Sequence, residues 1–160
     1  MIRVGVGYDA HPLVLGRPLV LGGVHIPHSR GLAGHSDSDV VAHAIVDALL
    51  GAAGLGDIGA YFPPGDSRFQ DADSMGFLVQ TVRLLSSRGW RIGNVDATII
   101  AQEPRLAPHV PQMRENLSRA LGVSIDQISV KGKSTNGLGF EGQGRGIAAH
   151  AVALIEAAHS

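Results

Sequence analysis

The chain has 160 residues, of which 44% are hydrophobic, and a formal net charge of -1 at pH 7. This length and apolar content suit a single domain, spanning residues 1–160, with its own hydrophobic core. The near-neutral charge argues against a protein that binds nucleic acid through bulk electrostatics. The absence of cysteine excludes disulfides and thiolate metal sites, so any zinc must be bound by histidine or by carboxylates.

The N-terminal residues indicate the compartment. They run directly into a strand-like pattern and lack the architecture of a signal peptide. No uninterrupted apolar run of about 18 residues occurs, so a membrane span is not expected. We therefore expect a soluble, cytoplasmic protein that binds neither membranes nor nucleic acid.

The first part of the chain has strand and loop patterns. Residues 2–8 alternate in the manner of a strand, and a short hairpin is predicted over 13–21 with its turn near Gly16. Residues 25–36 are predicted to be a loop.

Two helices are predicted in the middle of the chain. The first runs from about residue 39 to residue 53 and is capped by Asp37 or Ser38. A loop rich in proline, glycine and aspartate follows over 59–71. A second amphipathic helix is predicted over 73–89.

The last third alternates again. A strand is predicted over 91–101, a helix over 108–121 that is stopped by Gly122, and a strand over 128–131. Residues 146–158 are ambiguous, because their alanines favour a helix and their periodicity does not decide. Strands and helices that alternate within one domain predict an α/β or α+β fold.

Two local motifs fail on inspection. The glycine pair at residues 5–7 is similar to the start of a dinucleotide fingerprint, but the third glycine is missing. The segment 132–135, Gly-Lys-Ser-Thr, is similar to the end of a P-loop, but Gln127 stands where that motif requires a glycine. Neither motif predicts a nucleotide site.

A metal site is indicated by Asp9, His11 and His43. The two-residue spacing of Asp9 and His11 places both side chains on one face of the first strand. His43 lies in an otherwise apolar helix, in a polar stripe with Asp39 and Asp47. Such a stripe is either an exposed helix face or a functional one. In the functional interpretation, His43 completes a three-ligand zinc site with an open fourth position, and Asp47 holds a ring nitrogen of a ligand histidine.

A second cluster, His-Ser-Asp-Ser-Asp at residues 35–39, precedes the first predicted helix. Backbone N–H groups at a helix start attract phosphate, and a neighbouring histidine can donate a hydrogen bond to a phosphate oxygen. Ordinary capping uses serine or aspartate and gives no reason for a histidine. His35 is therefore a candidate phosphate-binding residue.

Nine short runs, collinear over nearly the whole chain, resemble the 2-C-methyl-D-erythritol 2,4-cyclodiphosphate synthase family of the non-mevalonate isoprenoid pathway. They are residues 9–11, 35–39, 47–53, 56–59, 62–63, 93–96, 99–102, 108–109 and 138–140. The resemblance implies an α+β (two-layer α/β) fold, with a mixed sheet packed against about three helices and a strand over 146–158. It also implies a homotrimer with active sites between adjacent subunits.

The implied activity is that of a phosphorus-oxygen lyase. The family cyclises 4-diphosphocytidyl-2-C-methyl-D-erythritol 2-phosphate to the 2,4-cyclodiphosphate and releases CMP. The resemblance implies one zinc ion per active site and a second divalent cation, Mg²⁺ or Mn²⁺, held mainly through substrate phosphates. It further implies a central cavity of the trimer that can hold an isoprenoid diphosphate.

By position, Asp9, His11 and His43 resemble the zinc ligands, and His35 and Ser134 resemble the pair that stabilises the transition state. Residues 57–59 resemble the segment that holds the methylerythritol, 101–107 the cytidine pocket, and 133–136 the segment at the diphosphate. The residues expected to bind substrate are Ser36, Asp57, Ile58, Gly59, Phe62, Asp66, Ala101, Pro104, Arg105, Leu106, Ala107, Lys133, Thr135, Asn136, Phe140 and Gln143.

Four positions depart from the family pattern. The family often has Thr where this chain has Ser134, and the hydroxyl is kept. The family commonly has Glu where this chain has Asn136, and that Glu is a ligand of the second cation. Because Asn brings no charge, we expect the protein to bind this cation more weakly. The family often has Arg and Glu at the positions of Gln143 and Arg145, which border the central cavity.

Other functions are compatible with parts of this pattern. A metal-dependent phosphohydrolase would use the same zinc site to deliver water and would yield linear phosphates. A non-catalytic trimer that holds isoprenoid diphosphate would not need the metal-binding set. A structural zinc usually has four protein ligands, often with cysteine. The remaining histidines are interpreted as surface, packing or capping residues: His25, His28, His109, His150 and His159.

Overall fold

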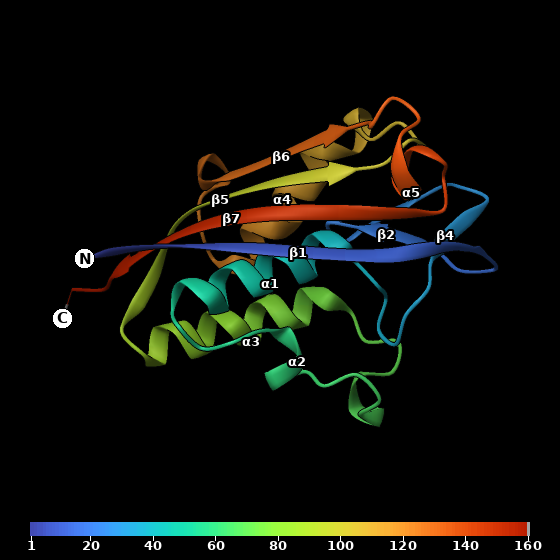
Figure 1. Ribbon diagram of the computed structural model, residues 1–160. Coiled ribbons are helices and arrows are strands. Elements are labelled where there is room, and N and C mark those ends of the chain that lie inside the picture. The colour runs from blue at the N-terminus through green and yellow to red at the C-terminus, as the bar shows by residue number, and fades with distance from the viewer. Residues whose placement is uncertain (160) are drawn as a thin grey trace.

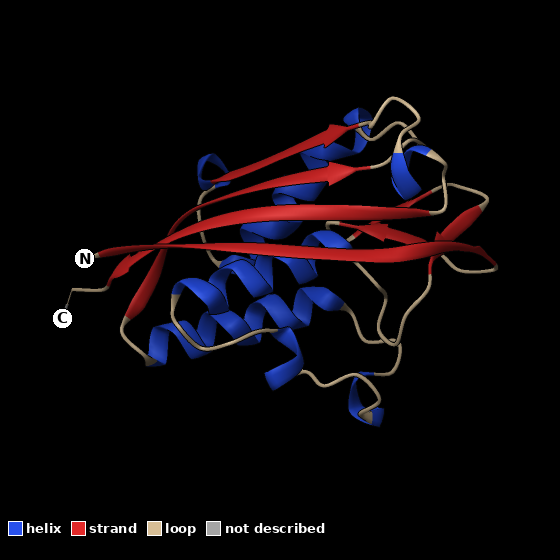
Figure 2. Cartoon of the chain, in the orientation of Figure 1, coloured by secondary structure: helices blue, strands red, loops and turns tan. Residues whose placement is uncertain are grey.

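A five-stranded sheet forms one layer of the molecule, and three long helices cover one of its faces (Figures 1 and 2). The computed structural model describes residues 1–159. Across the sheet, the strands are β4 (Arg30–Leu32), β1 (Ile2–Leu15), β7 (Gly146–Ala157), β5 (Trp90–Ile100) and β6 (Ile128–Lys133). The long helices are α1 (Val40–Ala52), α3 (Ser74–Ser87) and α4 (Val110–Leu121). The expected α+β class is confirmed.

The sheet is mixed, as expected. Strand β7 lies between β1 and β5 and is antiparallel to both, whereas β5 and β6 are parallel. A separate hairpin is made by β2 (Leu19–Leu21) and β3 (Val24–Ile26). The remaining elements are α2 (Ile58–Tyr61), η1 (Ser67–Phe69), η2 (Ala107–His109), η3 (Ile125–Gln127) and α5 (Gly139–Gly142). None of the helices in the described part of the chain has the length and apolar character needed to cross a bilayer.

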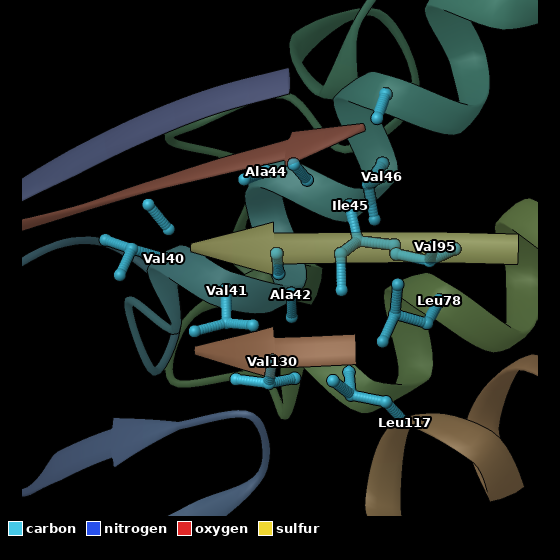
Figure 3. Close-up of a cluster of buried hydrophobic side chains, with 14 of the residues drawn as sticks. Val40, Val41, Ala42, Ala44, Ile45, Val46, Leu78, Val95, Leu117 and Val130 are labelled. Carbon is cyan, nitrogen blue, oxygen red and sulfur yellow. The ribbon is translucent and has the colours of Figure 1, made fainter. Parts of the chain in front are cut away.

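Helix α1 is the centre of the core. Nearly all of its side chains are buried, because the sheet covers one side and helix α3 packs against the other. Figure 3 shows α1 side chains such as Val41 and Ile45 among Val95 and Val130 of the sheet, Leu78 of α3 and Leu117 of α4. The apolar residues of α1, packed in this position, fix the height of His43 above the sheet.

Two glycines let α1 lie directly on β1. Both face inward on the strand, and a Cβ atom built on Gly5 would lie 1.9 Å from the carbonyl oxygen of Ala48. A Cβ atom on Gly7 would lie 1.8 Å from the carbonyl oxygen of Ala44. Because such distances are sterically forbidden, the absence of both side chains permits this helix–strand contact.

The hairpin predicted over 13–21 is wrong, and so is the loop predicted over 25–36. Gly16 does turn the chain, with φ 81°, but the segments on its two sides do not pair with each other. The end of β1 pairs with β4, and β2 pairs with β3, so both of these partners come from the segment predicted to be loop.

The true hairpin turn is made by Gly22 and Gly23, whose φ values are 57° and 73°. Their N–H groups donate to the carboxylate of Asp39 at 3.0 and 2.8 Å. Asp39 is also the N-cap of α1, where it accepts from two backbone N–H groups of the first turn. The cap is therefore Asp39 instead of Asp37 or Ser38, because this buried carboxylate joins the hairpin to the helix.

The other predicted elements agree with the structure. Helix α4 ends at Gly122, which has left-handed φ and ψ values of 66° and 34°. The segment over 146–158, ambiguous by its own pattern, forms strand β7 as the family resemblance implied. The short helices α2 and α5 were not predicted, since one turn of helix leaves little periodic signal.

Candidate functional site

The candidate metal centre combines the inward face of β1 with helix α1. One ligand atom from each of Asp9, His11 and His43 lies within 4.8 Å of the others. Asp9 Oδ2 is 3.0 Å from Nε2 of His11 and 3.0 Å from Nδ1 of His43. His43 is therefore buried and faces the strand, as the functional interpretation of the polar stripe predicted.

In each histidine ring, the nitrogen that points away from Asp9 is hydrogen-bonded to the protein. Nδ1 of His11 lies 3.0 Å from the carbonyl oxygen of Ala33, which can only accept, so this nitrogen carries the proton. Nε2 of His43 lies 2.8 Å from Ser74 Oγ and 3.2 Å from Ser36 Oγ. The other nitrogen of each ring faces Asp9. One carboxylate and two imidazoles so arranged fit a divalent metal such as zinc with a position left for a further ligand.

The three groups also perturb one another's titration. Burial raises the pKa of Asp9, but hydrogen bonds from His11 and His43, together with their charges, outweigh it and lower this pKa to about 2. Burial lowers the pKa of His11, yet the hydrogen bond and charge of Asp9 outweigh burial and raise it. In the metal-free protein, Asp9 is therefore ionised and His11 holds its proton more tightly than a free imidazole.

A cavity of about 240 Å³ opens beside this centre. Its walls include His35, Ser36, Ile58, Gly59 and Phe62, all predicted to belong to the site, together with Pro64, Phe69 and Phe77. Nε2 of His35 donates to the carbonyl oxygen of Asp66 at 2.7 Å, which ties the histidine to the loop after α2. The structure thus brings the predicted phosphate-binding histidine next to the metal centre.

Asp47 and Asp57 shape the segment at the mouth of this cavity. Asp47 accepts the N–H of Ile58 at 2.8 Å, and Asp57 accepts the N–H of Ala60 at 3.2 Å as the cap of α2. Asp47 was expected to hold a histidine nitrogen, but those nitrogens are bonded to a backbone carbonyl and to two serine hydroxyls. Burial raises the pKa of Asp47. Its observed contact fixes the start of α2.

A larger cavity, of about 850 Å³, lies where β5 and β6 end. Its walls include Ala101, Pro104, Arg105, Leu106, Ala107, Lys133 and Ser134, all predicted site residues. Leu106 is buried, whereas Arg105 and Lys133 are exposed. His28, interpreted from the sequence as a surface or packing residue, also lines this cavity.

The remaining predicted residues lie on the connection from β6 to β7. Thr135 donates to the carbonyl oxygen of Leu138, and Asn136 has a left-handed φ of 55°. Phe140 lines a third cavity, of about 280 Å³, with His11 and Arg145. Gln143 is the C-cap of the short helix α5.

The cavity at the metal centre and the cavity of about 850 Å³ share no residue within one chain. His35 lines the cavity at the metal centre and Ser134 lines the larger one, so the structure does not bring these two predicted partners together. Figure 1 shows the separation, with the ends of β5 and β6 at the top of the view and α2 at the bottom.

Sequence patterns gave no role to Ser74, Phe69 or Phe77. Phe62 stacks on Phe77 with ring centroids 4.4 Å apart, but Phe77 is an apolar residue of an amphipathic helix and resembles any core residue. Ser74 stands at a predicted helix start, where serine is common for capping alone. Only the folded structure shows that Ser74 contacts His43, which an ordinary capping serine would not do.

The comparisons with known proteins agree with one another. Residues 2–156 match the YgbB family. The 2-C-methyl-D-erythritol 2,4-cyclodiphosphate synthase of Moorella thermoacetica is 62% identical over 154 residues, which are 96% of this chain and 94% of that protein. The CDP complex of IspF from Plasmodium falciparum superposes with a TM-score of 0.87 at 37% identity, over 99% of this chain and 97% of the other. Bifunctional IspDF from Campylobacter jejuni gives a TM-score of 0.94 at 39% identity, and the match covers 98% of this chain and 42% of that longer one.

Proposed function

Because the chain belongs to the YgbB family, and because its curated relatives are 2-C-methyl-D-erythritol 2,4-cyclodiphosphate synthases, we propose that it catalyses this cyclisation in isoprenoid precursor biosynthesis. Its substrate is 4-diphosphocytidyl-2-C-methyl-D-erythritol 2-phosphate, and CMP is released. The observation that carries the proposal is the convergence of Asp9, His11 and His43 beside His35 and Ser36 in one cavity.

Asp9, His11 and His43 would hold zinc, because their donor atoms converge and the rear nitrogens of both rings are already hydrogen-bonded. Zinc bound there supplies a Lewis acid for an oxygen of the β-phosphate. A second divalent cation, Mg²⁺ or Mn²⁺, would be held mainly through substrate phosphates. Asn136 can offer such a cation only a neutral amide oxygen.

The chemistry requires no protein nucleophile. An oxygen of the 2-phosphate attacks the β-phosphorus, a new P–O bond forms, and the bond from that phosphorus to the oxygen of CMP breaks. The chain must fold the substrate so that its ends meet, and such orientation can be worth roughly 7–11 kcal/mol. His35 and Ser134 would donate hydrogen bonds to the charge that develops on the phosphates.

The cavity at the metal centre and the larger cavity at the ends of β5 and β6 suit the two ends of this substrate. The cavity of residues 101–107 offers backbone groups and the buried side chain of Leu106 for a cytosine ring, with Lys133 near the diphosphate. Ile58, Gly59 and Phe62 would contact the methylerythritol beside the metal centre. The relative from Plasmodium falciparum was solved as a CDP complex, which supports a cytidine site in this chain.

A homotrimer would complete the site. The outward face of β1 carries Ile2, Val4, Val6 and Tyr8, which are 48–68% exposed, and Val152 of β7 lies beside them. Such an apolar strand face favours contact with another subunit. Because the two cavities share no residue, the metal centre of one subunit would work with the larger cavity of its neighbour. Phe140, Gln143 and Arg145 would border the central cavity proposed for an isoprenoid diphosphate.

Phosphorus NMR of the purified protein with its substrate tests the proposal. We expect the cyclic diphosphate and CMP to appear only when zinc and magnesium are present. Linear phosphates would instead establish a phosphohydrolase. Bound substrate without turnover would indicate a binding protein.

A further inference from the structure

Ser74 contacts the metal centre from a direction that no ligand uses. It is the first residue of α3, it is fully buried, and its Oγ lies 2.8 Å from Nε2 of His43. It does not line the cavity beside the centre, whereas Ser36, at 3.2 Å from the same nitrogen, does. Ser36 can therefore turn its hydroxyl to a substrate, but Ser74 faces only the protein.

The orientation of Ser74 is set by Asp37. The Ser74 N–H donates to Oδ2 of Asp37 at 3.0 Å, and the Ser74 hydroxyl donates to Oδ1 of the same carboxylate. Asp37 is itself fixed, since its N–H donates to the Ala72 carbonyl at 3.0 Å and its Oδ1 accepts the Asp39 N–H at 3.1 Å. A hydroxyl has only one proton to donate, and Ser74 donates it to Asp37 in this hydrogen bond.

The direction of the remaining hydrogen bond follows. Because the Ser74 proton points at Asp37, its oxygen can only accept from His43, and Nε2 of His43 must carry the ring proton. Nδ1, which donates to the ionised Asp9 in the metal-free chain, is then the nitrogen that gives up its proton and offers a lone pair when a metal ion binds. The chain Asp37–Ser74–His43 thereby selects one tautomer and one ring plane.

We propose that Ser74 and Asp37 are positioning residues that hold His43 in its metal-binding tautomer. This inference deepens the proposed function and rests on its metal centre. Helix α3 supplies no ligand, yet it orients one, and a hydrogen-bonding group of this kind behind a ligand typically contributes about 10–100-fold to metal affinity.

The test is zinc affinity of the full-length chain, measured by competition with a chromogenic chelator. Ser74→Ala is expected to weaken zinc binding by about 10–100-fold. The matched control is Thr81→Val, which deletes another buried hydroxyl from the same helix. That hydroxyl donates to the Phe77 carbonyl at 2.7 Å and does not reach the centre. An unchanged affinity in Ser74→Ala, or an equal loss in the control, would overturn the proposal.

A spectroscopic readout separates positioning from general stability. In the zinc-loaded protein, the Nε2–H of His43 should give a slowly exchanging ¹⁵N–¹H signal, because Ser74 holds it in a buried bond. The signal should persist in Thr81→Val and disappear or exchange rapidly in Ser74→Ala. A slowly exchanging signal in Ser74→Ala would contradict the proposal.

Two further variants cover other outcomes. Asp37→Asn keeps the side-chain shape but no longer fixes the direction of the Ser74 hydroxyl, so a smaller loss of zinc affinity is expected; it replaces Ser74→Ala if that variant fails to fold. If Ser36→Ala weakens zinc binding by about 10–100-fold while Ser74→Ala and Asp37→Asn bind zinc normally, Ser36 is the positioning residue and the proposal is wrong. Zinc binding needs no substrate, so these results stand or fall separately from the detection of cyclic product.

Discussion

The metal centre and the larger cavity are built in different ways. The centre takes its groups from β1, α1 and α3, it is largely buried, and the rear nitrogens of both histidines are hydrogen-bonded. The larger cavity is lined mainly by two continuous stretches, residues 101–107 and 130–134, and carries exposed cations such as Lys133. The centre is therefore organised before any ligand arrives, whereas the cavity relies more on its ligand. In the proposed function, each end of the substrate would therefore be bound by a different part of the chain.

The largest expected effect separates the two regions completely. His43→Ala should abolish stoichiometric zinc binding and lower cyclisation by more than the roughly 100-fold typical of changes behind a ligand. CDP binding at the larger cavity should be unchanged. Zinc content, phosphorus NMR and calorimetry with CDP measure these quantities. Retention of one tightly bound zinc per chain would break the comparison.

The converse change acts on the larger cavity alone. Lys133→Ala should weaken CDP binding by roughly 10–100-fold, as expected when a charged hydrogen bond to phosphate is lost, and should leave zinc affinity intact. Lys131→Ala is the matched control, because Lys131 lines the same cavity but pairs with Asp96 at 2.7 and 2.8 Å. Equal effects of the two changes would show that general charge, and no specific contact, binds the diphosphate.

The pH dependence should belong to the metal centre. The pKa of His11 is raised above 6.5 in the folded chain, so its proton stabilises the metal-free protein fully below pH 6.5. This contribution is lost as the pH rises through the folded-state pKa. Zinc must displace the same proton, so zinc affinity should fall about tenfold per pH unit below that pKa. Asp9, with a pKa of about 2, stays ionised throughout. A flat zinc affinity across this window would contradict the assignment.

The smallest expected effect tests whether the two regions meet across a subunit interface. His43→Ala and Lys133→Ala chains, each impaired by itself, are unfolded together and reassembled at equal amounts. The mixture should reach about one quarter of wild-type activity in a cyclic trimer, because one site in four combines two intact halves. The assay uses substrate far below KM, where the Lys133→Ala chain is impaired. No recovery in correctly assembled mixed trimers would place both halves of the site in one chain.

The metal-binding group was predictable from the sequence because periodicity alone determines much of it. A spacing of two places Asp9 and His11 on one face of a strand, and a histidine within an apolar helix requires a buried partner. The hairpin of β2 and β3 was not predictable, since its turn depends on Asp39, which lies 16 residues after Gly23. The role of Ser74 depends in the same way on partners far along the chain.

Strand β7 shows where local propensity fails. Its alanines favour a helix, but β1 and β5 pair with it on both sides, and Ala149, Ala151 and Ala153 face α1. Small side chains are needed there because the helix lies close to the sheet. The alanines of β7 thus reflect the short distance between the helix layer and the sheet. A prediction from this segment alone cannot include that distance, because it depends on α1.

Gly5 and Gly7 have a consequence for the spacing of the three candidate metal ligands. The Cβ atom that Gly7 lacks would strike the carbonyl oxygen of Ala44, the residue that follows His43. A methyl group there would push α1 away from β1, whereas ligand distances in a metal site tolerate shifts of only about 0.2 Å. The two glycines therefore determine how closely α1 packs on β1. The distance between His43 on α1 and the two donors on β1 thus depends on two positions that carry no side chain.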